Sequence, residues 1–364
     1  HNKRSERRDH MKVAIVGCGN IAATHAKALI QQNQEIVLVI GRDQSKAKAF
    51  AEIWNIPSHS NQFTDALASS VDCIHICTPP AMHYEMAKAA LLAGKHVICE
   101  KPLCLNSEQA RELYQLAEER GLLAAVNFNV RYHEACQRGR KIVATPGFGA
   151  PRLIHGSYLQ EFHILPAQYM WRYIPEFGGL MRAVTEIGSH WIDLVRFWTG
   201  LEITAVSASF GCFHKDRYKK DGMMFAAPQP GSEHIIVESE DAAVVSLQFS
   251  NGAIGSLLLS EVSHGRSNCI KIEISSDENS VWWCSETPYQ IYTAQQFKGV
   301  TSVTNAFGGG FPDTFSSFFE EVYTSLQSGK AGNYPSFYDG YQNAAVCEAI
   351  YRSAKNHSEW TEVT

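Results

Sequence analysis

Glu100 and Lys101 stand directly before a proline, in the segment ICEKPLCL at residues 98–105. The apolar run HVIC at 96–99 is typical of a buried strand, so the two charges lie where that strand ends. They are either a solvated pair at a turn or part of a reactive site. Pro102 keeps Lys101 out of the α-helical region. Because an ammonium group stabilises a developing alkoxide, Lys101 is a candidate catalytic residue, and Glu100 could steady Lys101 or a ligand.

A second pair with reactive side chains, Glu186 and His190, lies in TEIGSHWIDLVRFW at 185–198. In a helix, residues four apart share a face, so the two side chains project together. An imidazole with a reference pKa of about 6.5 is suited to take a proton from a hydroxyl group, and a carboxylate beside it would orient the ring. An ordinary Glu–His pair on a solvated helix face remains the alternative. Gly188 weakens the helix by about 1 kcal/mol, which a close backbone approach, for example to a ligand, would explain.

A glycine-rich loop follows the first apolar run of the chain, in MKVAIVGCGNIAATHAKALI at 11–30. Gly17, Gly19 and Ala22 form G-x-G-x-x-A between a predicted strand and a predicted helix. The glycines allow a tight turn and close approach of a pyrophosphate, and the helix N-terminus offers N–H groups to that anion. This context predicts a dinucleotide site that includes Asn20 and Ile21.

The end of the second apolar run decides which dinucleotide would bind. An Asp or Glu usually holds the ribose 2′-hydroxyl there, whereas this chain has Gly41, Arg42 and Asp43. Gly41 would leave room for a larger group, and Arg42 could pair with a 2′-phosphate. Asp43 could turn inward or cap the next helix. The pattern predicts NAD(P) and slightly favours NADP.

The elements that must position these residues alternate in the first third of the chain. Apolar runs, including EIVLVI at 35–40 and HVIC, are separated by helical patterns at about 81–93 and 107–120. This order predicts a parallel sheet with helices on both faces. After about residue 130, alternating strand patterns joined by turns predict a largely antiparallel sheet, with a hairpin at 250–252.

The length of 364 residues favours two domains. We expect a disordered tail or cloning remnant at 1–10, a dinucleotide-binding α/β domain at 11–130, and an α+β domain with an open sheet at 131–364. The last two helical patterns would pack on that sheet or return to the first domain.

Composition excludes several classes of protein. The net charge is −5 with acids and bases mixed, so no basic face for nucleic acid is expected, and no stretch approaches a membrane span. Ten cysteines lie mostly among apolar residues without a Cys-x-x-Cys pair. They are typical of buried thiols in a reducing compartment, so we expect a cytoplasmic protein without a metal site.

The three motifs together, G-x-G-x-x-A at 17–22, Glu100-Lys101-Pro102, and Gly178-Gly179 leading to Glu186–Asp193, resemble the Gfo/Idh/MocA oxidoreductase family. The resemblance runs from Met11 to the C-terminus. It implies a Rossmann domain, and a second domain whose open sheet supports a homodimer or homotetramer. The family lysine and histidine fall on Lys101 and His190, but the family aspartate is Glu186 here, a departure that lengthens the side chain by one methylene group.

The resemblance further implies hydride transfer between NAD(P) and a sugar or cyclitol substrate. Besides the residues named above, it assigns Thr78, Pro79, His83, Pro102 and Arg131 to the cofactor. Residues after the first strand of the second domain are candidate sugar contacts: Tyr158, Gln160, His163, Trp171 and Arg172.

Two alternatives remain. One is a glycoside-cleaving enzyme that oxidises the ring transiently with bound NAD and would need the same residues. The other is a non-enzymatic cofactor-sensing regulator, against which the intact Lys101 and His190 argue. The sequence does not specify the sugar, the carbon oxidised, the physiological direction or the oligomer size.

Overall fold

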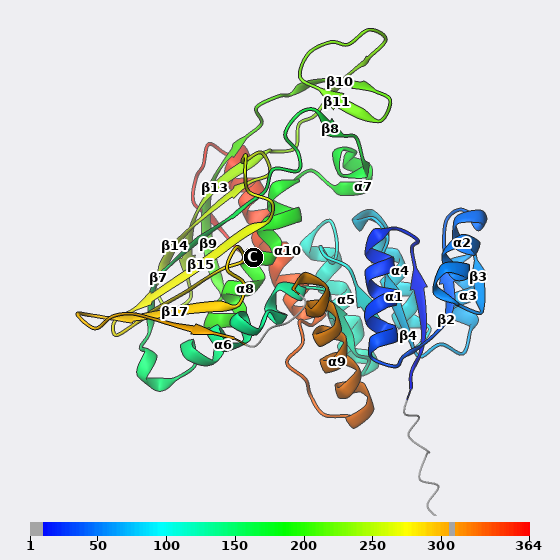
Figure 1. Ribbon diagram of the computed structural model, residues 1–364, viewed down its shortest axis with the longest axis horizontal. Helices are drawn as coiled ribbons and strands as arrows, with labels where there is room; N and C mark the ends of the chain where they lie inside the picture. Colours follow the sequence, from blue (N-terminus) through cyan, green and yellow to red (C-terminus); the bar gives the residue numbers. More distant parts are fainter. Residues whose placement is uncertain (1–9, 306–309) are drawn as a thin grey trace, which may run out of the picture. The chain divides into compact units, whose positions relative to one another are not determined.

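The computed structural model describes residues 10–305 and 310–364, and the chain divides into two compact units (Figure 1). The described residues of the first unit are 10–132 and 310–341, and those of the second are 133–305 and 342–364. The predicted fold class is confirmed, with a parallel α/β unit and a second, mainly antiparallel α+β unit.

The first unit is built on a six-stranded parallel sheet in the order β3-β2-β1-β4-β5-β6. This is the strand order of the Rossmann fold, in which the carboxyl ends of the strands form one edge. Its elements are β1 (Lys12–Val16), α1 (Asn20–Gln31), β2 (Glu35–Ile40), α2 (Gln44–Trp54), β3 (Ser58–Ser60), α3 (Phe63–Ala68), β4 (Cys73–Ile76), η1 (Pro80–Met82), α4 (His83–Leu92), β5 (His96–Cys99), α5 (Ser107–Arg120), β6 (Ala124–Val126), η2 (Asn129–Tyr132) and α9 (Phe311–Ser328).

The core of the first unit explains why these segments fold as they do. Strand β4 is fully buried, as expected for a continuous apolar run covered on both faces. Helix α9, from late in the chain, adds Phe315, Phe318 and Phe319 to the core that holds Val13 and Ile15. The helix predicted over 107–120 is confirmed as α5, whereas the polar edge strand β3 and the short α3 carried no sequence signal.

The second unit contains a nine-stranded sheet, β18-β17-β16-β15-β7-β14-β13-β9-β19, and a four-stranded sheet, β12-β10-β11-β8. The pairings are antiparallel except that β14 runs parallel to β7. Its elements are α6 (Glu134–Val143), η3 (Pro146–Phe148), β7 (Pro151–Leu159), β8 (Ala167–Gln168), η4 (Trp171–Tyr173), α7 (Pro175–Gly178), η5 (Val184–Gly188), α8 (Ser189–Thr199), β9 (Ile203–Gly211), β10 (Asp216–Lys220), β11 (Met223–Phe225), β12 (Glu233–Ile236), β13 (Ala242–Phe249), β14 (Ile254–Ser260), β15 (Cys269–Ser276), β16 (Ser280–Cys284), β17 (Gln290–Gln295), β18 (Gly299–Thr304) and β19 (Thr361–Glu362), while α10 (Phe337–Lys355) begins in the first unit.

The nine-stranded sheet has one covered face and one open face. Helix α6 contacts β16 and β17, and α8 contacts β7 and β15, on the side where both helices lie in Figure 1. Along β13, buried and exposed residues alternate, which is the pattern of a half-covered antiparallel strand. The predicted hairpin is confirmed, since β13 pairs with β14 across residues 250–253. On the open face Leu153, Val244, Ile254 and Leu258 are exposed.

The helix predicted over 185–198 consists of two parts. Val184–Gly188 form a π-helical turn, and Ser189–Thr199 form α8. The predicted apolar stripe is buried, including Trp191, whose Nε1 donates to the carbonyl of Lys271 at 2.8 Å. Within the described ranges, no helix has the length and apolar character that a membrane span needs.

Candidate active site

The glycine-rich loop lies at the carboxyl end of β1. Gly17 has φ +121°, and a Cβ there would lie 2.6 Å from the carbonyl oxygen of Cys77, so only glycine fits where β1 and β4 end side by side. Helix α1 begins at Asn20, and its N-cap residue Gly19 makes no side-chain capping bond. Gly19 and Asn20 are exposed and Ile21 is half-buried. The turn therefore presents backbone N–H groups to an anion.

The residues at the end of β2 have roles that differ partly from the expectation. A Cβ on Gly41 would lie 2.6 Å from Sγ of Cys18 and 3.1 Å from Cβ of Ala47. The space predicted for a larger ligand group is thus filled by Cys18 and Ala47, and packing explains this glycine. Asp43 caps α2 and accepts bonds from Ser45 N at 2.8 Å and Lys46 N at 3.3 Å. Arg42 is exposed.

The loop after β4 is tied to the segment after β5 through His83. This ring is fully buried, with Nε2 2.8 Å from the carbonyl oxygen of Thr78 and Nδ1 2.8 Å from that of Pro102. Burial lowers the pKa of His83, although the bonds to both carbonyls act in the opposite direction. His83 therefore connects two loops, whereas Thr78 and Pro79, both half-buried, lie nearer the surface. Arg131 is also buried and pairs with Asp339, Nη2 to Oδ1, at 3.2 Å.

Glu100 is a buried acceptor on which several donors converge. Its Oε1 lies 2.8 Å from Nε2 of His25 and accepts from Nδ2 of Asn127 at 2.5 Å. Its Oε2 accepts from the backbone N–H of Lys101 at 3.3 Å. Burial raises the pKa of Glu100, but the bonds from His25 and Asn127 and the charge of Lys101 outweigh it, so the pKa is lowered overall. Glu100 is thus an ionised carboxylate that fixes the backbone of Lys101, and the Lys101–Pro102 peptide is cis.

A chain of hydrogen bonds continues from Glu100 into the core. His25 Nδ1 lies 2.9 Å from His75 Nδ1, and His75 Nε2 lies 2.7 Å from the hydroxyl of Tyr323. Since an ionised carboxylate only accepts, His25 donates to it from Nε2. If both rings are neutral, His75 then donates to His25 and accepts from Tyr323. Burial lowers the pKa of His75 well below its ordinary value, which favours this neutral arrangement.

In the second unit, Glu186 lies on the π-helical turn, four residues before His190. Its Oε2 accepts from Nε of Arg172 at 2.8 Å, and the guanidinium of Arg172 lies 4.6 Å from the ring centre of Trp171. Burial lowers the pKa of Arg172, but the Glu186 carboxylate more than compensates and raises it overall. The structure therefore brings together Trp171, Arg172 and Glu186, three residues that the sequence predicted separately.

His190 lies at the start of α8 and is 8% exposed. The ring of Tyr158, on β7, has its centre 6.3 Å from that of His190. The hydroxyl of Tyr158 and Nε2 of Gln160 both donate to Oδ1 of Asn268, each at 2.7 Å. Burial raises the pKa of Tyr158, so its hydroxyl stays protonated. Two predicted sugar contacts are thus joined through Asn268, which sequence reasoning did not identify.

Packing within the second unit explains why residue 188 is a glycine. A Cβ on Gly188 would lie 2.7 Å from Cδ1 of Leu259 on β14. The expected close approach of the backbone is thus present, and its partner is the sheet of the second unit.

A buried charge cluster lies next to the predicted residue His163. Nδ1 of His163 bonds the hydroxyl of Tyr173, and its Nε2 lies 3.9 Å from Oε2 of Glu261. Arg182 Nε lies 3.4 Å from the same Glu261 oxygen, and Arg182 also pairs with Asp241. Burial lowers the pKa of His163 to about 3 and raises that of Glu261 to about 8. His163 is therefore a buried neutral member of this cluster.

Sequence reasoning missed the partners of these residues because they come from distant segments. His75 did carry a signal, because a histidine in the middle of the apolar run CIHIC must find a polar partner when that strand is buried. Asn127 comes after β6 as Lys101 comes after β5. The strand order alone therefore predicts that Asn127 lies at the carboxyl edge of the sheet. Arg182, Asp241 and Glu261 had no comparable signal.

Comparisons with known proteins bear on the family and the fold of this chain. A model described as the oxidoreductase family with an NAD-binding Rossmann fold matches residues 11–128, and a GFO/IDH/MocA C-terminal domain matches residues 136–281. Levoglucosan dehydrogenase of Pseudarthrobacter phenanthrenivorans is 29% identical over 316 residues, 80% of each chain. An uncharacterised oxidoreductase of Synechocystis sp. is 30% identical over 261 residues, 70% of this chain and 67% of that protein.

A solved structure of levoglucosan dehydrogenase in complex with NADH and L-sorbose is 25% identical to this chain, with a TM-score of 0.89. The alignment covers 98% of this chain and 99% of that one. Because family models match both halves and the likeness extends over nearly the whole chain, this protein belongs to the Gfo/Idh/MocA family of NAD-binding oxidoreductases.

Proposed function

We propose that this protein transfers a hydride between a nicotinamide dinucleotide and one carbon of a sugar, sugar derivative or cyclitol. The observation that carries the proposal is the carboxyl edge of the first unit's sheet. The glycine loop after β1, the Thr78 loop after β4 and Lys101 after β5 all stand on this edge, where such folds bind ligands. The likeness to levoglucosan dehydrogenase supports a carbohydrate substrate.

The glycine loop fits the proposed cofactor on structural grounds. A Cβ on Gly19 would meet nothing within 4 Å, so the turn is open there, and the exposed start of α1 provides N–H groups for the pyrophosphate. When bound, the nicotinamide would supply the hydride chemistry. At the end of β2, where the adenosine ribose would bind, the Asp43 carboxylate already caps α2. The exposed Arg42 is then the side chain that would contact the ribose. These residues favour NADP, whereas the solved relative contains NADH, so the ratio of the two activities must be measured.

The proton would be handled by residues of this chain. A sugar hydroxyl is too weak an acid to ionise unaided, so removal of its proton requires a positioned base. We assign this role to His190, since an imidazole exchanges protons near neutral pH. The ammonium group of Lys101 would stabilise the developing alkoxide, and Glu100 fixes the Lys101 backbone through its 3.3 Å bond.

The residues around His190 would hold the sugar. Trp171 offers an aromatic face, and Arg172 is fixed by Glu186 through a 2.8 Å bond. Tyr158 and Gln160 are held by Asn268. We therefore assign Glu186 a positioning role: it holds Arg172 beside the helix that carries His190.

The test is a screen of sugars, cyclitols and their oxidised forms with NAD and NADP, in which absorbance of the reduced nicotinamide is followed. With a substrate found, Lys101→Ala and His190→Ala should each lower kcat by about 10²- to 10⁴-fold, the typical contribution of such groups. Cofactor affinity, measured by calorimetry, should change little.

Two matched variants serve as controls, because Lys141 and His214 are exposed residues outside the proposed site. Lys141→Ala and His214→Ala should keep the wild-type rate. Wild-type turnover in Lys101→Ala or His190→Ala would overturn the catalytic assignment. Release of a sugar without net formation of reduced cofactor would replace the dehydrogenase by the glycoside-cleaving alternative.

A further inference from the structure

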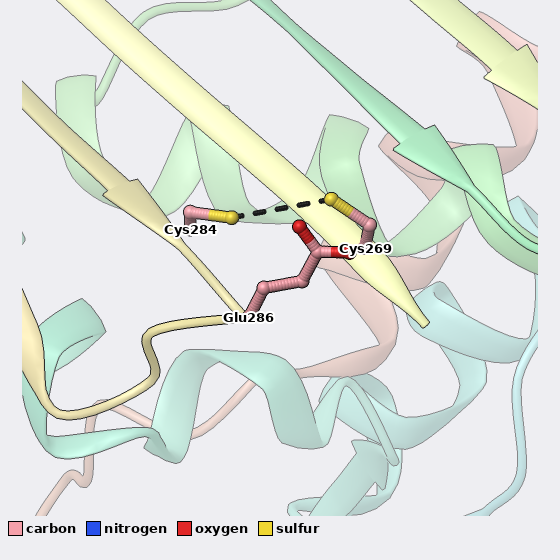
Figure 2. Close-up of side chains that lie close together, drawn as sticks. All are labelled: Cys269, Cys284 and Glu286. Carbon is pink, nitrogen blue, oxygen red and sulfur yellow. Dashed lines mark hydrogen bonds between the residues drawn. The ribbon is translucent and has the colours of Figure 1, made fainter. Parts of the chain in front are cut away.

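Two thiols and a carboxylate meet at one end of the β15–β16 pair, outside the residues used above. Sγ of Cys269 lies 3.9 Å from Sγ of Cys284, and one ligand atom from each of Cys269, Cys284 and Glu286 lies within 4.8 Å of the others. Figure 2 shows the two thiols facing each other from neighbouring strands, with the Glu286 carboxylate beside Cys269. No other group of three such ligands was found among the described residues.

Strand register explains this convergence. Lys271 pairs with Cys284 in the antiparallel ladder, so Glu286 stands opposite Cys269 and Cys284 stands on the diagonal. Residues two apart along a strand share a face, and all three side chains therefore project from one side of the sheet. The backbone continues this pairing at the strand end, where Ser285 N donates to the carbonyl of Ile270 at 3.0 Å. The donor atoms are thus placed by regular sheet geometry.

We propose that Cys269, Cys284 and Glu286 bind a thiophilic divalent cation, with zinc as the best match. In a tetrahedral zinc site with Zn–S bonds of about 2.3 Å, two sulfur ligands are about 3.8 Å apart. The observed distance of 3.9 Å between the two sulfur atoms is close to this separation. Two thiolates and a carboxylate would leave the fourth position to water.

A disulfide fits the same atoms less well. The two sulfurs would have to approach to about 2.05 Å, in a geometry that needs Cα atoms about 4.4–6.8 Å apart. Diagonal neighbours in an antiparallel pair are typically about 7–8 Å apart, so the backbone would have to move. A metal ion spans the observed gap without such a movement.

The surroundings of the cluster suit a bound cation with an entry path. Cys269 is fully buried and Cys284 half-buried, whereas the Glu286 side chain is 36% exposed. Arg266 Nη1 donates to Oε2 of Glu286 at 2.6 Å, and Oε1 is then the oxygen for the metal. Arg266 would orient the ligating carboxylate from outside, as partners of metal ligands do.

The test uses the full chain, reduced and freed of metal with a chelator, then titrated with Co²⁺ and afterwards with Zn²⁺. We expect Co²⁺ to give the strong visible bands of a tetrahedral site with thiolate ligands, saturating at one ion per chain, and Zn²⁺ to bleach them. Cys269→Ser and Cys284→Ser should each abolish the bands, and Glu286→Gln should weaken binding by about tenfold or more.

The matched control is Cys212→Ser, since Cys212 is an exposed thiol outside this cluster and donates to the carbonyl of Val237. This variant should bind Co²⁺ as the wild type does. Circular dichroism would establish that each variant folds, and Cys284→Ser, at the half-buried position, is the less disruptive of the two ligand changes. Octahedral-type spectra, unchanged bands in both ligand variants, or formation of a Cys269–Cys284 disulfide by the metal-free protein with no Co²⁺ binding by the reduced protein would overturn the proposal.

Discussion

Replacement of Glu100 by leucine tests the reasoning about the buried carboxylate before Lys101. Two fully buried donors, His25 Nε2 and Asn127 Nδ2, would lose their acceptor, while the half-buried Lys101 N–H could be hydrated. Each buried donor left without a partner costs about 1–3 kcal/mol, so Glu100→Leu should destabilise the first unit by about 2–6 kcal/mol.

Removing the buried charge of Glu100 does not turn this predicted loss of stability into a gain. A charge that was unfavourable overall would show a raised pKa, whereas the pKa of Glu100 is lowered. The hydrogen bonds therefore outweigh desolvation, and the ionised group stabilises the fold. Because the folded pKa lies below the ordinary value, this contribution is complete above the unfolded pKa and fades as pH falls through the folded pKa. The leucine variant should lack this acid-sensitive contribution.

Glu100→Gln should have an intermediate effect. An amide offers one acceptor oxygen and two donor hydrogens. With its oxygen toward His25 and Asn127 it keeps both of those bonds, but its NH₂ group then faces the Lys101 N–H, which loses its acceptor. The measurement is urea unfolding together with amide exchange in β5 and β6, where local opening of the first unit is seen directly.

The control is Glu112→Leu, because Glu112 is a half-exposed carboxylate that pairs with Lys88 at 2.6 Å on the surface. That change should stay within about 1 kcal/mol. If Glu100→Leu lost no more stability than Glu112→Leu, Glu100 would not be the acceptor that holds this edge of the sheet.

Two further predictions concern the cofactor and pH. Arg42→Ala should lower the NADP-to-NAD ratio of kcat/KM by about tenfold or more, as expected when a charged partner of a phosphate is removed, and an unchanged ratio would mean that Arg42 does not meet the ribose. Because burial raises the pKa of Glu261 to about 8, the folded state holds a proton that the unfolded state releases at lower pH. Above about pH 6.5, where unfolding no longer protonates His163, stability of the second unit should therefore fall toward pH 8, by about 1.4 kcal/mol per pH unit where Glu261 alone differs between the states. Glu261→Gln should flatten this slope in calorimetric melts across that range, and an equal slope in both proteins would contradict the assignment.

The sequence predicted most of the architecture because local signals sufficed. Continuous apolar runs such as HVIC at 96–99, the helical pattern over 107–120 and the turn at 250–252 each depend on neighbours within a few residues. Their order along the chain then predicted the parallel and antiparallel halves. Helix α9 illustrates the limit, because its pattern predicted a helix but left open which unit it would join.

The partners of the site residues could not be predicted, since they depend on contacts between distant segments. Glu100 meets His25 and Asn127 across 75 and 27 residues, and His75 meets Tyr323 across 248. Gly41 shows the same limit, because it suggested room for a ligand while its true neighbours are the side chains of Cys18 and Ala47.

Glu100 and Glu186, the two carboxylates of the motifs, each make hydrogen bonds or an ion pair within their own unit. These contacts restrict the roles that the two residues can have in the mechanism. Glu100 accepts from three donors and has a lowered pKa, so protonation would break bonds that hold Lys101 in place. Glu186 is paired with Arg172 at 2.8 Å, and taking up a proton would break that ion pair. Both carboxylates are therefore engaged in contacts that protonation would weaken. The imidazole of His190 is then the remaining motif group with the appropriate chemistry, which supports its assignment as the base and the assignment of both carboxylates to positioning.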